Sequence, residues 1–386
     1  MQERAAWLAW AQISGIGPVA LQRLQERFGS LTKAWTAPLD ELGSVSGVGP
    51  IVLKAIATQR PQLNPEAFLN THLQANPTFW TPADPDYPRL LKEIPDPPAV
   101  LYYRGNPALL DAQGRNPVVG IVGTRDPTDY AQRWTRKLAI TLAKNHIAVI
   151  SGMAEGVDTQ AHLGCLEAKG QTIAVLGTGT DIAYPPRNRE LHQQILAKGL
   201  VISEYPAGTP PSRSHFPRRN RMIAALSRAT LVMEAPQRSG ALITAYMAND
   251  YGRDVYVLPG TLDNPRAAGC LGLMTRGAQL ILGEGHLMEL LGRIPTLDPI
   301  LTQTSLCFEA PPPPVAAPTP TLSAELQKIW TLVRSLHEES GQTALSFDQL
   351  VQNAAQPSNE VSSALLQLEL MGLVTQLPGM RYAVVT

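Results

Sequence analysis

The sequence predicts an α/β fold built on a doubly wound, mainly parallel sheet, and three observations support this class. Between residues 117 and 290, short apolar segments alternate with segments of helical periodicity. The apolar segments are nearly continuous, as expected of parallel strands covered on both faces. Most of them end at or beside Gly or Glu. Because ligands of such sheets bind at the carboxyl ends of the strands, we expect the binding site at that edge.

The elements of this central region are predicted from the same pattern. Its strands are expected at residues 118–123, 147–152, 172–177, 200–204, 229–235 and 254–260. Helices are expected between them, among others at residues 128–145, 157–168 and 239–251. A proline-rich connection over residues 70–116 leads into the first strand, so the whole domain is placed at 71–300.

Residues 1–70 are predicted to form a helical domain. The stretches ISGIGPVALQRL (13–24) and VSGVGPIVLKAI (45–56) share one pattern, in which Gly-x-Gly-Pro opens an amphipathic helix. This pattern is typical of the helix-hairpin-helix, or SAM-like, domain, which can hold a DNA phosphate at a helix N-terminus. The hairpins contain few basic residues, Arg23 and Lys54, so a structural or protein-binding role stays open beside DNA binding.

A linker and a small C-terminal domain complete the predicted organisation. Six prolines in APPPPVAAPTP (310–320) indicate a semi-rigid linker, placed at 301–321. Three helical segments and a two-stranded wing then predict a winged helix over 322–386. Its expected recognition helix, 358–371, contains Glu360 and Glu369 but no Lys or Arg, so a protein partner is at least as well supported as DNA.

The charge pattern points to a specific anionic partner. Lys plus Arg equals Asp plus Glu, 32 of each, which argues against general adhesion to nucleic acid or anionic lipid. Between Glu204 and Glu234, however, the chain has no acidic residue. The basic residues of that interval are Arg213, Arg218, Arg219, Arg221 and Arg228. A local cationic block among glycine-rich strand ends predicts a phosphate backbone as ligand.

Cellular placement follows from the cysteines and the apolar runs. The three cysteines are sparse and form no CxxC motif, which argues against a disulfide framework or a zinc site and fits a reducing compartment. The N-terminal residues lack the pattern of a signal peptide, and no uncharged apolar run reaches the roughly 18 residues that span a bilayer. We therefore expect a cytoplasmic protein without a membrane partner.

The first candidate phosphate contacts are Gly123, Thr124 and Arg125, which follow the first predicted strand. Glycines let an anion approach backbone N–H groups, and a guanidinium binds phosphate oxygens with two parallel hydrogen bonds. The motif is not GxGxxG, which argues against a dinucleotide cofactor. Ser239 and Gly240 open a later helix and are expected to supply further donors; no Walker motif accompanies them.

A second group, Arg218, Arg219, Asn220 and Arg221, lies at a predicted helix start. Three positive charges there oppose the helix dipole unless an anion or an acidic neighbour compensates them. The alternative to DNA binding is a salt-bridge network with Glu204 and Glu234. Elsewhere, Asp158 and His162 suit either acid–base chemistry or, as we favour, helix capping and packing.

Together these stretches resemble the DprA family, the DNA-processing proteins of natural transformation. The resemblance spans essentially the whole chain and rests on Tyr87-Pro88 with Asp96-Pro97-Pro98, Gly120–Arg125, SGMAEGVDTQAH (151–162), TIAVLGTGTDIAYPPRN (172–188), ISEYPAGTPP–HFPRRNR (202–221), EAPQRSGALITA (234–245) and GRDVYVLPG (252–260). Many motifs in the family's order make the resemblance specific.

The resemblance implies a protein that binds incoming single-stranded DNA on an extended Rossmann-like domain. It also implies a homodimer through that domain and transfer of the DNA to the recombinase RecA, without catalysis, cofactor or metal. The DNA-binding residues it implies are Arg125, the Arg-Asn-Arg segment at 219–221 and a basic residue after Tyr184-Pro185. Pro186 stands where some relatives have Lys, and Arg187 is taken in its place.

Two other functions are weighed against this one. Nucleotide-processing enzymes of the lysine-decarboxylase-like (phosphoribohydrolase) group share the sheet type, but the carboxylate expected in their PGGxGTxxE motif falls on Thr244 here. A winged-helix transcription regulator is the other alternative, and the acidic recognition helix argues against it.

Overall fold

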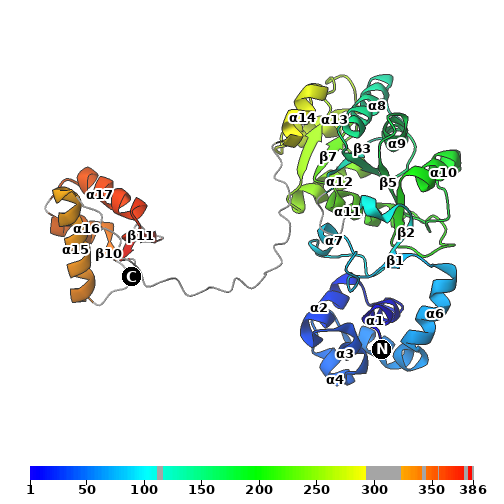
Figure 1. Cartoon of the computed structure of the whole chain (residues 1–386), viewed down its shortest axis with the longest axis horizontal. Coiled ribbons are helices and arrows are strands. Elements are labelled where there is room, and N and C mark those ends of the chain that lie inside the picture. Colours follow the sequence, from blue (N-terminus) through cyan, green and yellow to red (C-terminus); the bar gives the residue numbers. More distant parts are fainter. Residues whose placement is uncertain (111–115, 293–322, 341–344, 355, 378–380, 385–386) are drawn as a thin grey trace, which may run out of the picture. The chain divides into compact units, whose positions relative to one another are not determined.

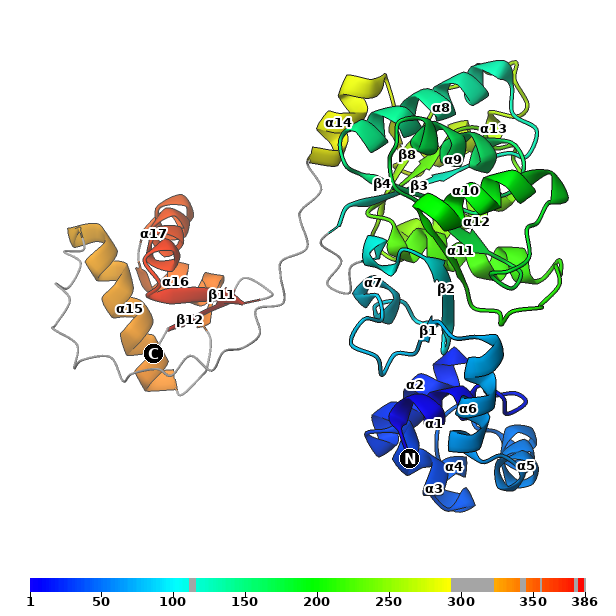
Figure 2. The same ribbon diagram turned by 45° about the vertical axis from the view of Figure 1, so that its right-hand side comes forward.

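A computed structural model describes residues 1–110, 116–292, 323–340, 345–354, 356–377 and 381–384 (Figures 1 and 2). The chain divides into two compact units, Met1–Thr302 and Gln303–Thr386. The predicted linker, 301–321, lies outside the described residues. In the part of the chain that is described, no helix combines the length and apolar character needed to cross a membrane.

A nine-stranded sheet organises the first unit, with the strand order β1-β2-β6-β5-β4-β3-β7-β8-β9. Its strands are β1 (Phe79–Trp80), β2 (Leu101–Gly105), β3 (Val118–Val122), β4 (Ala148–Ser151), β5 (Thr172–Leu176), β6 (Leu200–Ser203), β7 (Ala229–Val232), β8 (Asp254–Val257) and β9 (Gln279–Leu280). The strands from β6 to β9 in this order run parallel, and β2 and β1 extend the sheet antiparallel from β6. The predicted doubly wound, mainly parallel sheet is confirmed.

Helices cover both faces of this sheet (Figures 1 and 2). Their bounds are α7 (Arg89–Lys92), α8 (Asp129–Lys144), α9 (Val157–Glu167), α10 (Arg189–Lys198), α11 (His215–Leu226), α12 (Gly240–Asp250), α13 (Ala268–Met274) and α14 (Glu284–Gly292). Val119 and Ile121 of β3 pack with Leu138 of α8, whereas Val118 and Val122 pack with Met222 of α11. Side chains of one strand thus alternate between two cores, which is why parallel strands are apolar throughout.

All six predicted strands are present and begin within one residue of the expected position. Strands β1 and β2 were not predicted, because they lie in the stretch assigned to a proline-rich connection. Trp80 stacks on Tyr103 with ring centroids 4.0 Å apart, and the Tyr87 hydroxyl donates to the Pro98 carbonyl at 2.9 Å. The proline-rich stretch therefore belongs to the sheet domain and carries part of its core.

The N-terminal helices are α1 (Glu3–Trp10), α2 (Pro18–Phe28), α3 (Leu31–Thr36), α4 (Leu39–Gly43), α5 (Pro50–Gln59) and α6 (Pro65–Ala75). Helices α2 and α5 begin at the prolines of the two repeated motifs, after extended Gly17 and Gly49. Arg23 of α2 donates to the Ser46 carbonyl at 3.0 Å, and Gln59 donates to the Ser14 hydroxyl at 3.0 Å. Each hairpin is thus held by a side chain from beyond its own loop.

The second unit is a small helical domain with a three-stranded sheet of order β10-β12-β11. Its elements are α15 (Ala324–Ser340), β10 (Leu345–Ser346), α16 (Phe347–Ala354), α17 (Ser358–Leu370), β11 (Val374–Leu377) and β12 (Arg381–Val384). Val361, Leu365 and Leu368 of α17 are buried in its core. The predicted wing is present as the antiparallel pair of β11 and β12.

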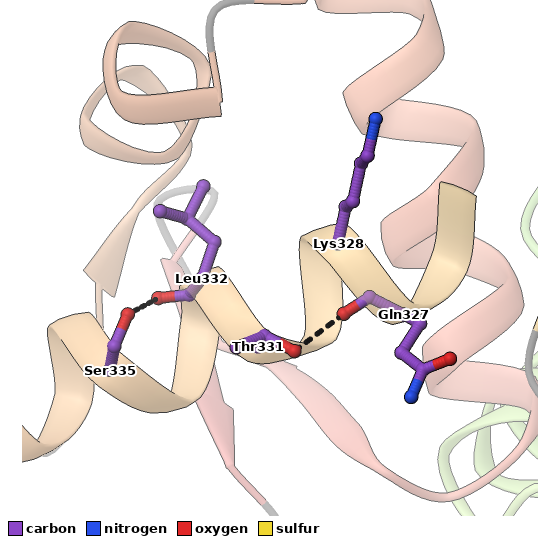
Figure 3. Close-up of a pocket in the computed structure, with 5 residues that line it drawn as sticks. All are labelled: Gln327, Lys328, Thr331, Leu332 and Ser335. Atoms are coloured by element: carbon purple, nitrogen blue, oxygen red, sulfur yellow. Dashed lines mark hydrogen bonds between the residues drawn. The ribbon is translucent and has the colours of Figure 1, made fainter. Parts of the chain in front are cut away.

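A cavity of about 550 Å³ lies along α15 of this unit (Figure 3). The Thr331 hydroxyl donates to the Gln327 carbonyl at 2.7 Å, and the Ser335 hydroxyl donates to the Leu332 carbonyl at 3.1 Å. Both hydroxyls donate to backbone carbonyls of their own helix. They therefore give no support for a polar binding site in this cavity.

His162 of α9 is fully buried in the first unit. Its Nδ1 lies 2.7 Å from the Thr172 hydroxyl, which donates to the Val149 carbonyl at 2.9 Å. Burial, and secondarily the charge of Arg219, lowers the pKa of His162 to about 3. A neutral, packed imidazole is the alternative that we favoured over acid–base chemistry.

Replacing His162 should therefore change how stability depends on pH. The unfolded chain takes up a proton near pH 6.5, whereas folded His162 takes one up only near pH 3, so the folded state loses stability as pH falls through this interval. His162→Gln should remove about 2 kcal/mol of that loss between pH 6.5 and 5, measured by urea unfolding. His146→Asn, which changes an exposed histidine at a positive φ, is the control. If the free energy of unfolding depends on pH in the same way for wild type and His162→Gln, the lowered pKa of His162 is contradicted.

Candidate nucleic-acid interface

The candidate site lies at the carboxyl ends of the parallel strands, where β3 and β7 are neighbours. The helices that follow these two strands, α8 and α12, pack on opposite faces, so this is the topological switch point of the sheet. Glu234, directly beyond β7, joins the loops around it. Its carboxylate accepts from the Thr128 hydroxyl at 2.9 Å and from the Asn264 amide at 2.8 Å. The loops after β3, β7 and β8 are therefore fixed together.

Gly123, Thr124 and Arg125 form the loop after β3. A Cβ on Gly123 would lie 2.5 Å from Val157, so only glycine permits this close approach. The Val157 N–H donates to the Thr124 carbonyl at 3.2 Å. Arg125 is exposed, and within the described residues no carboxylate forms an ion pair with it. Its guanidinium is thus available to an external anion.

Two aromatic rings adjoin Arg125. The Arg125 guanidinium carbon lies 5.7 Å from the centroid of the Phe216 ring, and Phe216 lies 5.4 Å from Tyr184 at an interplanar angle of 30°. Tyr184 is 36% exposed. The sequence analysis assigned no role to the Phe216 ring. Its place immediately before the Pro-Arg-Arg stretch was the signal that could have revealed it.

The arginines of α11 differ sharply in their surroundings. Arg221 is 2% exposed and pairs with Glu204 at 2.5 Å and with Asp96 at 2.9 Å. Arg218, half exposed, also pairs with Glu204, at 2.9 Å. This geometry does not favour the predicted contact of Arg221 with DNA, because two carboxylates already neutralise its buried charge. Of the two acids proposed for an internal network, only Glu204 takes part, since Glu234 binds Thr128 and Asn264.

Arg219 lies beneath the site rather than at its surface. It is 4% exposed, its guanidinium donates to the Val175 carbonyl, and a Cβ on Gly152 would collide with its Nη1. Burial lowers the pKa of Arg219 to about 10, Asp158 acts against this shift, and Arg125 adds to it. Arg219 therefore stays protonated at neutral pH. In this structure Arg219 is a buried positive charge that interacts electrostatically with Arg125, rather than the exposed phosphate donor that the sequence predicts.

Asp158, at the start of α9, is the buried carboxylate near Arg219. It accepts from the Ala154 N–H at 3.3 Å. Burial raises the pKa of Asp158, and Arg219 opposes that shift. The carboxylate thus holds the loop after β4 in place and compensates part of the buried charge of Arg219.

Of the remaining predicted residues, Arg187, Ser239 and Gly240 lie at two other helix starts, and Asn220 lies within α11. Arg187 is exposed in the 3-10 turn Pro186–Asn188, three residues after Tyr184. Asn220 donates to the Gly240 carbonyl at 3.2 Å, which ties α11 to the start of α12. The Ser239 hydroxyl accepts from the Ala241 N–H at 3.2 Å and so caps α12, while Gly240 is exposed. Asn220 thus contacts Gly240 through a hydrogen bond. Arg125 lies beside the Phe216 ring, which in turn contacts Tyr184.

Replacing Arg221 should destabilise the protein. In Arg221→Ala, Glu204 keeps a 7% exposed charge without its principal partner, so the free energy of unfolding should fall by about 3–5 kcal/mol. Arg218→Ala, which removes a half-exposed partner of the same carboxylate, should cost no more than about 1 kcal/mol. Urea unfolding of both variants measures the difference. Equal, small losses would show that the Glu204–Arg221 pair is not the brace described here.

Comparison with known proteins finds family matches in both parts of the chain. Residues 78–292 match the family model described as DNA recombination-mediator protein A, and residues 311–380 match the DprA winged helix domain. Protein Smf of Synechocystis is 50% identical over 398 residues, covering 98% of each chain.

Two solved structures are similar as well. DNA processing protein A from Streptococcus pneumoniae superposes with a TM-score of 0.64 at 32% identity, covering 75% of this chain and 98% of that one. DNA processing protein A from Helicobacter pylori, whose structure addresses its single-stranded DNA binding mode, has a TM-score of 0.50 at 33% identity, covering 55% of this chain and 95% of its own. The chain belongs to the DNA recombination-mediator protein A (DprA) family.

Proposed function

We propose that this protein binds single-stranded DNA, without strong sequence specificity, at the carboxyl edge of its central sheet. The observation that carries the proposal is Arg125, an exposed cation that stands over Phe216 at the switch point of the sheet. The buried charge of Arg219 lies within electrostatic reach beneath it. An anion at Arg125 would therefore meet two positive charges and find one partly solvated guanidinium to bind.

The chemistry of this edge suits an unpaired strand. A guanidinium pairs with phosphate oxygens through two hydrogen bonds, and aromatic rings stack on bases of any sequence. Phe216 and Tyr184 adjoin Arg125, and exposed Arg187 extends the cationic side. Phosphate contacts position a strand without reading its bases, which accounts for weak sequence preference. The single-stranded DNA binding named for the Helicobacter pylori relative supports the same ligand.

Transfer of the bound strand to the recombinase RecA, during DNA uptake and recombination, completes the proposed function. It is supported by the family's description as a recombination mediator. We also propose a homodimer through the sheet domain. Ile243 and Tyr246 of α12 are 38% and 39% exposed, and clustered exposed apolar side chains mark association surfaces. The two described cysteines, Cys165 and Cys270, are buried and unpaired, which fits the cytoplasm as the proposed location.

The residue at the position of the expected catalytic carboxylate favours binding over catalysis. Thr244, the position expected to carry the carboxylate of a phosphoribohydrolase, is a buried residue of α12 with 1% exposure. A threonine hydroxyl cannot replace a carboxylate as a general acid–base group at neutral pH. For the regulator alternative, the exposed residues of α17 include Glu360 and Leu366, a surface unsuited to DNA phosphates.

Removing Arg125 should weaken DNA binding without unfolding the protein. Arg125→Ala should lower the affinity for oligo-dT by about 1.5–3 kcal/mol, because a charge-assisted hydrogen bond is lost. The slope of log affinity against log salt should also become shallower by roughly 0.7–1. Fluorescence anisotropy over a salt series measures both quantities.

Arg133→Ala is the matched control, since it removes the same charge from an exposed position on α8. It should leave the affinity and the salt slope nearly unchanged. If folded Arg125→Ala binds oligo-dT as tightly as Arg133→Ala does, Arg125 is not the phosphate contact and the proposed site is wrong.

A further inference from the structure

A cleft of about 460 Å³ lies beside the candidate interface, between the N-terminal helices and the sheet. The first hairpin contributes Ile16, Gly17 and Leu21 to its lining, and the sheet contributes Tyr102 and Tyr205. Neither the sequence motifs nor the proposed DNA site accounts for this cavity. Its volume is in the range of about 300–1,000 Å³ typical of small-molecule sites.

The walls of the cleft combine apolar surface with polar edges. Tyr205 stacks on His215 with ring centroids 3.9 Å apart and an interplanar angle of 18°. The Tyr205 hydroxyl is buried and has no hydrogen-bond partner among the described residues. Gln12 and Asn76 bring amide groups to the same cleft, and Asn76 Oδ1 accepts from the Ala207 N–H at 2.8 Å. A cleft lined by apolar side chains, tyrosine rings and amide groups has the composition of a nucleobase site.

The first turns of α11 contribute residues both to the surroundings of the cleft and to the candidate interface. His215 belongs to the stacked pair beside the cleft, and Phe216, the next residue, belongs to the ring pair beside Arg125. Arg218 also lines the cleft. Glu204 lines it too, but its charge is taken up by Arg218 and Arg221. A strand leaving Arg125 would therefore meet no unpaired carboxylate of Glu204 as it reached the cleft.

We propose that this cleft receives a nucleobase of the same single strand that the sheet edge binds, with the base against Tyr205 and its polar edge toward the Tyr205 hydroxyl and the amides. This inference rests on the proposed function, because it requires a strand already held at Arg125. It adds a second contact region, formed partly by the first helix-hairpin-helix motif. Longer strands should thus gain affinity that short ones lack.

The glycine at position 17 allows the cleft to be filled selectively. Gly17 precedes α2 with φ −105° and ψ 177°, which any residue adopts, and a Cβ there would have no atom within 4 Å. Gly17→Phe therefore adds a ring at the lining of the cleft without backbone strain. Gly49 precedes α5 with φ −76° and ψ 176°, has the same free space and lies outside the residues lining the cleft. Gly49→Phe is the matched control.

The experiment measures affinity for oligo-dT of increasing length, from about four to about sixteen nucleotides, by fluorescence anisotropy. Wild type and Gly49→Phe should show a step in affinity once the strand is long enough to reach the cleft. Gly17→Phe should bind the short strands normally and lose the step, about tenfold, which is the contribution of one stacked base. A 2-aminopurine placed at the step position should be quenched by wild type and not by Gly17→Phe.

Two results would overturn the inference. If Gly17→Phe follows Gly49→Phe at every length, the cleft holds no base, while the site at Arg125 stands. If wild type binds no oligo-dT of any length, the proposed function fails and the cleft proposal fails with it.

Discussion

The site depends on how the positive charges of α11 are compensated. Glu204, at the end of β6, takes up the charge of Arg221 and shares in that of Arg218. Asp158 compensates only part of the charge of Arg219, which burial leaves with a lowered pKa. One helix therefore contributes both an internal brace and a buried positive charge. Arg221, paired with Glu204 and Asp96, fixes α11 against the proline-rich stretch. Arg219 places its buried positive charge near Arg125 at the edge of the sheet.

Close packing of the loops is what allows a guanidinium to lie beneath them. Gly152 leaves room for Arg219, and Gly123 leaves room for Val157. A side chain at either position would displace the loops that surround Arg125. The hydrogen bonds of Glu234 also keep these loops in place, because they connect the ends of three strands. The proposed binding of a strand would then need little reorganisation, and preorganised sites lose less free energy on binding.

Much of the fold could be predicted from the sequence, because buried parallel strands are continuous apolar runs. Strands β1 and β2 could not, since Phe79–Trp80 is too short to show a pattern and LYYRG (101–105) lies among prolines. In the site, Arg125 was predictable from its place after a glycine-rich strand end. The pairing of Arg221 with Asp96 was not, because 125 residues separate them and only the tertiary fold brings them together. Burial of Arg219 likewise depends on packing against Gly152.

Arginine-resolved NMR of the guanidinium groups, with oligo-dT added stepwise, tests the central claim most directly. The signals of Arg125 and Arg219 should shift as the strand binds, because one guanidinium meets the phosphate and the other senses it from below. The signal of Arg221 should stay in place, since Glu204 and Asp96 hold it. A shift of Arg221 with Arg125 and Arg219 unmoved would contradict the division of charges described here.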